Sequence, residues 1–200
     1  MKKMTLAALG LFALAGPCGY AVAGVDDMAK KCDECHGSGG NSSHEEVPNI
    51  AGMSVTYIHD AMMAYQSGDR PGKKYKPENG DETDMNAVAK KLSEDDINAL
   101  AEHYAGKTFE VHEQKVDAAL AATGKKHFNK DCKKCHSEGG SLADDDAGIL
   151  AGQWKPYLQH QFELFSSGER EMPKKMSKRF EKLDDDAKAA IIEFLAGGSK

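Results

Sequence analysis

The sequence predicts an all-α protein made of two tandem copies of one small helical domain. Three observations predict this: identical residues recur at a constant separation of 100 positions, apolar residues follow helical spacing with no convincing strand, and one cysteine motif occurs once in each half. The length of 200 residues, with 40% hydrophobic and 29% charged content, fits one or two globular domains. The chain carries a net charge of −6, whereas a protein that binds nucleic acid needs a basic face, so no nucleic-acid partner is expected.

Residues 1–23 have the pattern of a secretory signal peptide that is removed from the mature chain. Two lysines precede an apolar run, and the segment ends in Ala-Val-Ala, the small residues that a signal peptidase accepts. The run is shorter than the roughly 20 residues that span a membrane, although a retained anchor stays as the alternative. Cys18 follows Pro17, where a lipoprotein site needs a small residue, so we expect it to be lost with this segment. The mature protein is therefore expected to be soluble, in the periplasm, and without a membrane span.

The four remaining cysteines all lie in two copies of the pattern C-x-x-C-H. The two motifs are Cys32-Asp33-Glu34-Cys35-His36 and Cys132-Lys133-Lys134-Cys135-His136. This pattern is the attachment signature of c-type haem. Two thiols three positions apart can add to the two vinyl groups along one porphyrin edge, and the adjacent histidine then binds the iron. The sequence predicts two covalently bound haem c groups, with His36 and His136 as axial ligands.

Other cysteine chemistries fit the two motifs less well than haem attachment. The two pairs are separated by 96 residues, whereas the pairs of a zinc ribbon are about 15 to 20 residues apart. A thioredoxin-like dithiol needs a strand before the first cysteine, but the residues before Cys32 follow helical spacing. Disulfide bonds are a further alternative, because they form in an oxidising compartment. Neither zinc nor disulfides explain the histidine after both pairs.

The repeat defines the expected domains, which are residues 24–106 and 115–200, joined by a linker at 107–114. Eleven residues of the first copy are identical to the residues 100 positions later: Cys32, Cys35, His36, Gly39, Gly40, Ala51, Gly52, Tyr57, Ser67, Gly68 and Arg70. Each copy is expected to begin with a helix that carries the motif. A second helix should end at Gly68 or Gly168, and a last helix should begin at Ser93 or Asp184. Such small units hold little apolar core, so a bound porphyrin would supply it.

Met85 and Met176 are the expected sixth ligands of the two irons. Each precedes a leucine by seven residues when the copies are aligned by their last helices. Met172 is the rival of Met176, whereas Met53 has no methionine at its repeat position and is a doubtful ligand. Thioether sulfur raises the potential of haem iron, and two occupied axial positions leave no substrate site. The pattern therefore favours electron transfer, and a peroxidase, which needs a vacant axial position, stays as an alternative.

The remaining histidines and methionines have simpler interpretations. No other histidine recurs at matching positions in both copies, so ligation of both irons by two histidines is not expected. We expect these histidines to be solvated surface groups: His44, His59, His103, His112, His127 and His160. Met28, Met62 and Met63 lie in helical patterns and are expected to be packing residues.

Several segments resemble known dihaem cytochromes. The tandem motifs and the segments 48–52, 67–70 and 85–104 resemble periplasmic dihaem cytochromes of the c4 type. The second half resembles the dihaem subunit of flavocytochrome c sulfide dehydrogenase more closely. The segments that carry this second resemblance are 118–124, 132–140, 149–154, 156–158 and 172–176. The resemblance implies two tandem class I cytochrome c domains that pack about a pseudo-twofold axis with their haems close together.

The resemblance also implies partners. In the sulfide dehydrogenase, an FAD-containing subunit oxidises sulfide and passes electrons to the dihaem subunit. This chain has no G-x-G-x-x-G fingerprint, so any flavin would belong to the partner and no catalysis is expected from this chain alone. The alternative is a free dihaem cytochrome of the c4 type that exchanges electrons with other redox proteins, such as a terminal oxidase or reductase.

The sequence also contains a long charged segment in the first half and two acidic runs in the second. The segment between Arg70 and Met85 is nine residues longer than that between Arg170 and Met176, and we expect it to lie beside the first haem. The acidic runs 144–146 and 184–186 could steer a basic partner, but solvated faces or helix starts are the simpler expectation.

Overall fold

A computed structural model describes residues 24–198 of the chain, so the predicted signal peptide and Cys18 lie outside the described residues. Within this range the regular structure is helical, apart from an isolated antiparallel bridge between Tyr75 and Thr83. The elements are α1 (Val25–His36), η1 (Ser38–Gly40), α2 (Val55–Ser67), α3 (Met85–Ala89), α4 (Glu94–Ala105), α5 (Ala118–Asp131), η2 (Ala143–Asp145), α6 (Lys155–Ser167), α7 (Lys174–Phe180) and α8 (Asp185–Ala196). None of the described helices is long and apolar enough to cross a membrane.

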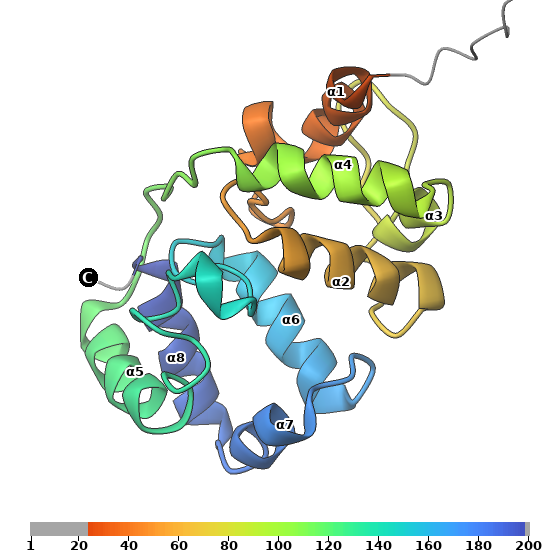
Figure 1. Ribbon diagram of the computed structural model, residues 1–200. Helices are drawn as coiled ribbons and strands as arrows, with labels where there is room; N and C mark the ends of the chain where they lie inside the picture. The colour runs from red at the N-terminus through yellow and green to blue at the C-terminus, as the bar shows by residue number, and fades with distance from the viewer. Residues whose placement is uncertain (1–23, 199–200) are drawn as a thin grey trace, which may run out of the picture.

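The eight α-helices form two groups of four, in agreement with the predicted all-α repeat. Figure 1 shows α1 to α4 in the upper half and α5 to α8 in the lower half, joined by one extended segment between α4 and α5. Each helix of the first group has a counterpart in the second, in the same order along the chain. The structure thus has the two-domain architecture that the internal repeat predicts.

Local sequence signals set the helix ends. Gly68 and Gly168 adopt the left-handed conformation after α2 and α6, which ends each helix at the expected glycine. Ser93 and Asp96 form a reciprocal capping box at the start of α4. The side chain of Asp184 accepts a hydrogen bond from the Ala187 amide at the start of α8. The acidic run 184–186 therefore includes a helix cap.

The second core depends on a close crossing of α5 and α8. Phe128 of α5 is buried in the same cluster as Ile191 and Leu195 of α8. At the crossing, a Cβ added to Gly124 would lie 1.9 Å from the carbonyl oxygen of Ala190. Backbone atoms cannot yield as a flexible side chain can, so this crossing requires glycine at position 124.

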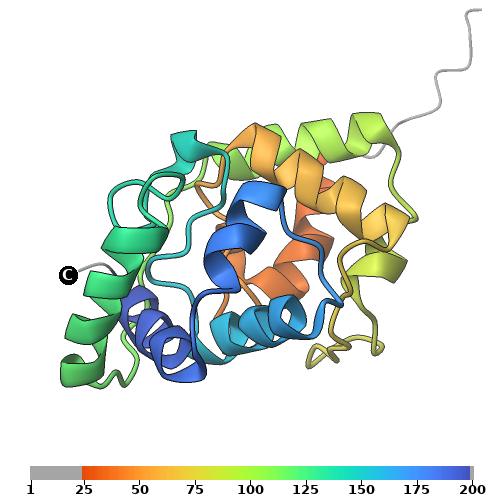
Figure 2. The same ribbon diagram turned by 90° about the horizontal axis from the view of Figure 1, so that it is seen from below.

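The two domains are joined by buried hydrogen bonds. The side-chain oxygen of Gln153 accepts from the Asn49 amide at 3.0 Å, and its nitrogen donates to the Asn49 carbonyl at 2.8 Å. Both residues have 0% exposure. Trp154 Nε1 also donates to the Ser42 carbonyl at 2.7 Å. In the view from below, α7 of the second domain lies at the centre, between α2 of the first domain and α6 of the second (Figure 2).

Gly124→Ala should destabilise the protein by about 1–3 kcal/mol, because the added methyl group overpacks the α5–α8 crossing. Gly197→Ala is the matched control. Gly197 follows α8 with an ordinary φ of −74°, and a Cβ there meets no atom closer than 3.5 Å. Denaturant unfolding of both variants measures the effect. Equal stabilities for the two variants would contradict the packing account.

Gln153→Ala should weaken the coupling between the domains, because it leaves the buried Asn49 amide and carbonyl unpaired at a cost of about 1–3 kcal/mol. Calorimetry should then show the two domains unfolding in separate transitions. Gln66→Ala serves as the control, since Gln66 donates to Ala89 and Leu92 within one domain. If both variants lower stability without a difference in the number of transitions, Gln153 does not couple the domains.

Candidate haem sites

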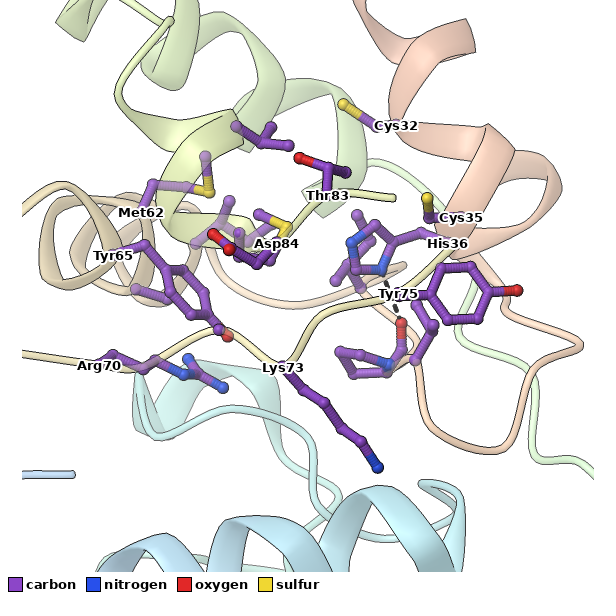
Figure 3. Close-up of a pocket in the computed structure, with 18 of the residues that line it drawn as sticks. Cys32, Cys35, His36, Met62, Tyr65, Arg70, Lys73, Tyr75, Thr83 and Asp84 are labelled. Carbon is purple, nitrogen blue, oxygen red and sulfur yellow. Dashed lines mark hydrogen bonds between the residues drawn. The ribbon is translucent and has the colours of Figure 1, made fainter. Parts of the chain in front are cut away.

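A cavity of about 520 Å³ lies in the first domain, closed on one side by residues of α6 from the second. It brings together Cys32, Cys35, His36 and Met85, the four residues that the sequence assigns to the first haem. Figure 3 shows Cys32, Cys35 and His36 projecting from one helix, α1, with Tyr75 beside His36. A cavity of this size is in the range that binds a cofactor.

His36 ends α1 and is held in one orientation. Its Nδ1 lies 2.9 Å from the carbonyl oxygen of Pro48 (dashed in Figure 3). A carbonyl can only accept, so Nδ1 carries the proton and Nε2 keeps its lone pair. The side chain is 7% exposed, and burial lowers the pKa of His36. A neutral imidazole with a free Nε2 is the form that binds a metal.

The two thiols of the first motif lie one helical turn apart on α1. Burial raises the pKa of both Cys32 and Cys35, so both are neutral thiols at neutral pH. Cys32 packs against the first core, whereas Cys132 packs against the second. Because the two pairs belong to different cores, the structure does not assemble them into one four-cysteine zinc site.

Met85 is the first residue of α3 and is placed by its neighbours. Asp84 caps α3 by accepting from the Ala87 amide at 2.8 Å. The Asn86 side chain accepts from the Gly72 amide and donates to the carbonyls of Tyr65 and Arg70. Asn86 therefore anchors the segment before α3 to the end of α2. Sequence reasoning missed this residue, because its partners are distant along the chain.

Met28 and Met62 also line the cavity and pack against the first core. This agrees with the packing role expected for both, whereas the same expectation for Met63 is wrong, because Met63 is 39% exposed. Met53 is 3% exposed in the same core. Met85 differs from these three because it starts a short helix between two segments of loop, in the position that the repeat alignment gives to an iron ligand.

Arg70, which is buried, and Arg170, which is partly buried, test whether the site fits a haem. Arg70 is 5% exposed and lines the cavity, and its Nε is buried without a hydrogen-bond partner among the described residues. Burial and the neighbouring Arg70 charge lower the pKa of Arg170. Within residues 24–198 neither guanidinium forms an ion pair, although three carboxylates line a pocket with them: Asp60, Asp69 and Glu171. A buried cation needs an anion, and haem carries two carboxylates, so the residues present fit the group.

The second domain contributes directly to the first cavity. Tyr157, His160 and Gln161 of α6 line it. Arg70 donates to the Tyr157 hydroxyl at 3.0 Å and to the Gln161 side-chain oxygen at 3.4 Å. Arg70 is identical to Arg170 in the repeat, and Tyr157 is identical to Tyr57, but the repeat indicates no role for either residue. A contact between distant segments has no local sequence signal.

In the second domain, the haem motif lies in turns. Helix α5 ends at Asp131, whereas α1 continues through His36. His136 lies beside Phe128, and its Nδ1 is buried without a hydrogen-bond partner among the described residues. Burial lowers the pKa of His136. Unlike Nδ1 of His36, this nitrogen has no carbonyl partner among the described residues, so only the first site shows the hydrogen bond that fixes the ring.

Met172 and Met176 are both partly buried in the second domain. Met172 packs against the second core, and Met176 lies within α7. The helix ends support the alignment that pairs Met176 with Met85, since α3 ends three residues before Leu92 and α7 ends three residues before Leu183.

The structure gives several polar residues specific places. Asp145 of the acidic run 144–146 accepts hydrogen bonds from the amide and hydroxyl of Ser137, next to the second motif. The expectation that His112 is a solvated surface group is wrong: its ring stacks on Trp154 with centroids 4.8 Å apart. Its Nε2 is buried, because the extended segment before α5 packs against the start of α6. His160 likewise lines the first cavity.

Comparisons with known proteins agree with this geometry. The family described as "Cytochrome c" matches residues 21–104, and the family described as "Cytochrome C oxidase, cbb3-type, subunit III" matches residues 119–195. Cytochrome c4 of Stutzerimonas stutzeri is 30% identical over 82% of this chain and 81% of its own length. The thiosulfate dehydrogenase electron acceptor of Thiomonas intermedia is 27% identical over 84% of this chain and 77% of its own length.

A solved structure shows the same architecture. The crystal structure of reduced recombinant cytochrome c4 from Pseudomonas stutzeri matches 90% of this chain and 99% of its own with a TM-score of 0.70 and 27% sequence identity. Two cytochrome c domains in this arrangement bind two covalent haem c groups. The chain therefore belongs to the cytochrome c4 family of dihaem electron-transfer proteins.

Proposed function

We propose that this protein is a periplasmic one-electron carrier and that Cys32, Cys35, His36 and Met85 hold its first haem. The observation that carries the proposal is the single cavity that all four residues line. Haem c supplies the one-electron iron couple when it is bound. The chain supplies two thioether links, a nitrogen and a sulfur ligand. If His36 and Met85 both bind the iron, no iron position would be left for a substrate.

The second haem is assigned by correspondence. Cys132 and Cys135 are the proposed attachment residues, and His136 and Met176 are the proposed axial ligands. Cys132, Cys135 and His136 occupy the repeat positions of the corresponding residues in the first motif. The assignment of Met176 is supported by equal spacing, because α3 and α7 each end three residues before a leucine. Met172 stays as the rival ligand because it packs against the same core as Cys132.

The protein's side chains prepare the first site. The Pro48 carbonyl holds the His36 proton on Nδ1, which leaves Nε2 unprotonated and able to bind a metal. The lining of the cavity is mainly apolar, and such surroundings would favour the less charged ferrous state of a bound haem and raise its reduction potential. Arg70 and Arg170 offer positive charge at the domain boundary, where haem carboxylates can pair with them.

The comparisons favour a free carrier that exchanges electrons with separate redox proteins, such as a terminal oxidase or reductase. A relative named for accepting electrons from thiosulfate dehydrogenase suggests a sulfur-oxidising donor. An FAD-containing sulfide dehydrogenase subunit is the second candidate partner, based on the segment around Trp154. That side chain bonds to Ser42 and stacks on His112 within this chain, so it offers little to an external flavoprotein.

Met85→Ala and Met176→Ala should each remove the sulfur–iron absorption band of one haem, because each exposes one axial position. The reduced variants should bind carbon monoxide rapidly at that haem, whereas the native protein should not. Ferric near-infrared spectra and carbon monoxide titration measure both effects. Rapid carbon monoxide binding to the native protein would instead favour a peroxidase.

Met53→Ala and Met172→Ala are the matched controls for the ligand series. Both remove a thioether packed in or against a core and should lower stability while keeping both sulfur–iron bands. Loss of a band in Met172→Ala, with Met176→Ala unchanged, would reassign the second ligand.

Co-expression with the FAD-containing sulfide dehydrogenase subunit separates the two partner hypotheses. A free carrier should elute alone with both haems and be reducible by a separate donor dehydrogenase. A stable complex that contains flavin and two haems would overturn the free-carrier proposal in favour of a flavocytochrome subunit.

A further inference from the structure

The two domains differ sharply in charge. Residues 24–106 contain 16 acidic and 8 basic side chains, whereas residues 115–200 contain 14 acidic and 15 basic side chains. The acidic net charge of the chain therefore belongs to the first domain. A partner approaching this molecule meets two different electrostatic surfaces.

Basic side chains of the second domain gather around its haem motif. We call the following six exposed residues the basic surface: Lys133, Lys134, Lys174, Lys175, Lys178 and Arg179. The first two lie inside the C-x-x-C-H motif, and the other four lie on α7, which carries Met176. Arg179 Nη1 lies 3.4 Å from Asp131 Oδ1, which joins the end of α7 to the residue before Cys132. This contact places the end of α7 beside the end of α5, directly before the motif.

Few acidic groups oppose the basic surface. Asp131 is paired with Arg179, and its side chain is 8% exposed. Glu181 follows α7 and accepts a hydrogen bond from Ser177. Glu138 is exposed beyond the motif. Asp145 accepts hydrogen bonds from Ser137, next to the motif. The six residues of the basic surface therefore outnumber these four acidic groups.

The first domain presents a different arrangement. Its motif contains Asp33 and Glu34, and α3 contains no charged residue. The longer segment 71–84 also lies against the first cavity, as expected from its length, and is fixed there. Lys73 pairs with Glu46 at 2.7 Å.

Tyr75 completes the cover over the first motif. Its ring lies 5.3 Å from that of His44, and Figure 3 shows it beside His36 and Cys35. Cys35 is partly buried, whereas Cys135, in the domain with the shorter segment, is exposed. The first attachment site is therefore covered by a segment two of whose lysines are paired with carboxylates, and the second is open and basic.

We propose that the basic surface docks an acidic one-electron redox protein and that the second haem is the haem that exchanges electrons with it. This inference rests on the proposed function. One electron passes between the second haem iron and the partner's redox centre, so one is oxidised as the other is reduced and no bond is made or broken. The first haem then exchanges electrons with the second inside the molecule.

The test compares two triple charge reversals in the haem-loaded protein. Lys174→Glu, Lys175→Glu and Lys178→Glu together alter the basic surface. The matched control, Lys76→Glu, Lys90→Glu and Lys107→Glu, changes the same net charge at exposed sites of the first domain and the linker. The probe is oxidised plastocyanin, an acidic copper protein, mixed with each reduced variant in a stopped-flow instrument at low ionic strength.

The basic-surface variant should lower the second-order rate constant by about tenfold or more, and the control by less than about twofold. Both differences should vanish at high salt, where charges are screened. Equal losses in the two variants, or no loss in the first, would overturn the proposal. If the triple variant fails to fold, Lys175→Gln with Lys178→Gln repeats the comparison and should show a smaller loss of the same sign.

Two further measurements distinguish protein docking from lipid binding and from a loss of haem. Sedimentation with phosphatidylglycerol vesicles tests lipid docking. Loss of vesicle binding in the basic-surface variant, with an unchanged plastocyanin rate, would overturn the proposal in favour of a membrane surface. The haem content of the native protein tests the proposed function separately, because a protein that lacks two haems fails before any docking is measured.

Discussion

The covalently bound haem in each domain is the constraint on which the rest of the structure depends. Around the first site the helices surround a cavity that lies against the first side-chain core. Cys32 and Cys35 must lie on one face of α1, His36 must end that helix, and a sulfur must reach the cavity from a separate segment. Four short helices can meet these demands only if a group of porphyrin size fills the space between them.

The domain boundary is built to serve both sites. Gln153 and Asn49 exchange two buried hydrogen bonds across it, and Tyr157 and Gln161 of α6 complete the wall of the first cavity. Gly148 has a φ of +75°, and a Cβ there would lie 2.7 Å from the Tyr57 ring. These contacts hold the two domains against each other, and the rate of electron transfer between the two sites depends on their separation.

The sequence predicts those parts of the molecule that local spacing determines. The C-x-x-C-H motif, the glycines that end α2 and α6, and the cap at Ser93 each act over one or two helical turns, so their positions can be derived from the chain alone. Met85 needs more, because only the comparison of the two copies separates it from the packing methionines. The repeat makes that comparison possible.

Contacts between distant segments could not be predicted in the same way. Arg70 bonds to Tyr157, 87 residues later, and Asn86 ties Gly72 to α3 through its side chain. The stacking of His112 on Trp154 likewise depends on how the segment before α5 crosses the second domain. These contacts depend on the folded arrangement of both domains, and no residue spacing encodes them.

The most direct test of this account is the intact mass of the protein produced in a host that attaches c-type haem. The account predicts the mass of the mature chain plus two haems. Replacement of both cysteines of either motif by alanine should reduce this to one haem. A native protein that carries one haem, or none, would contradict the account.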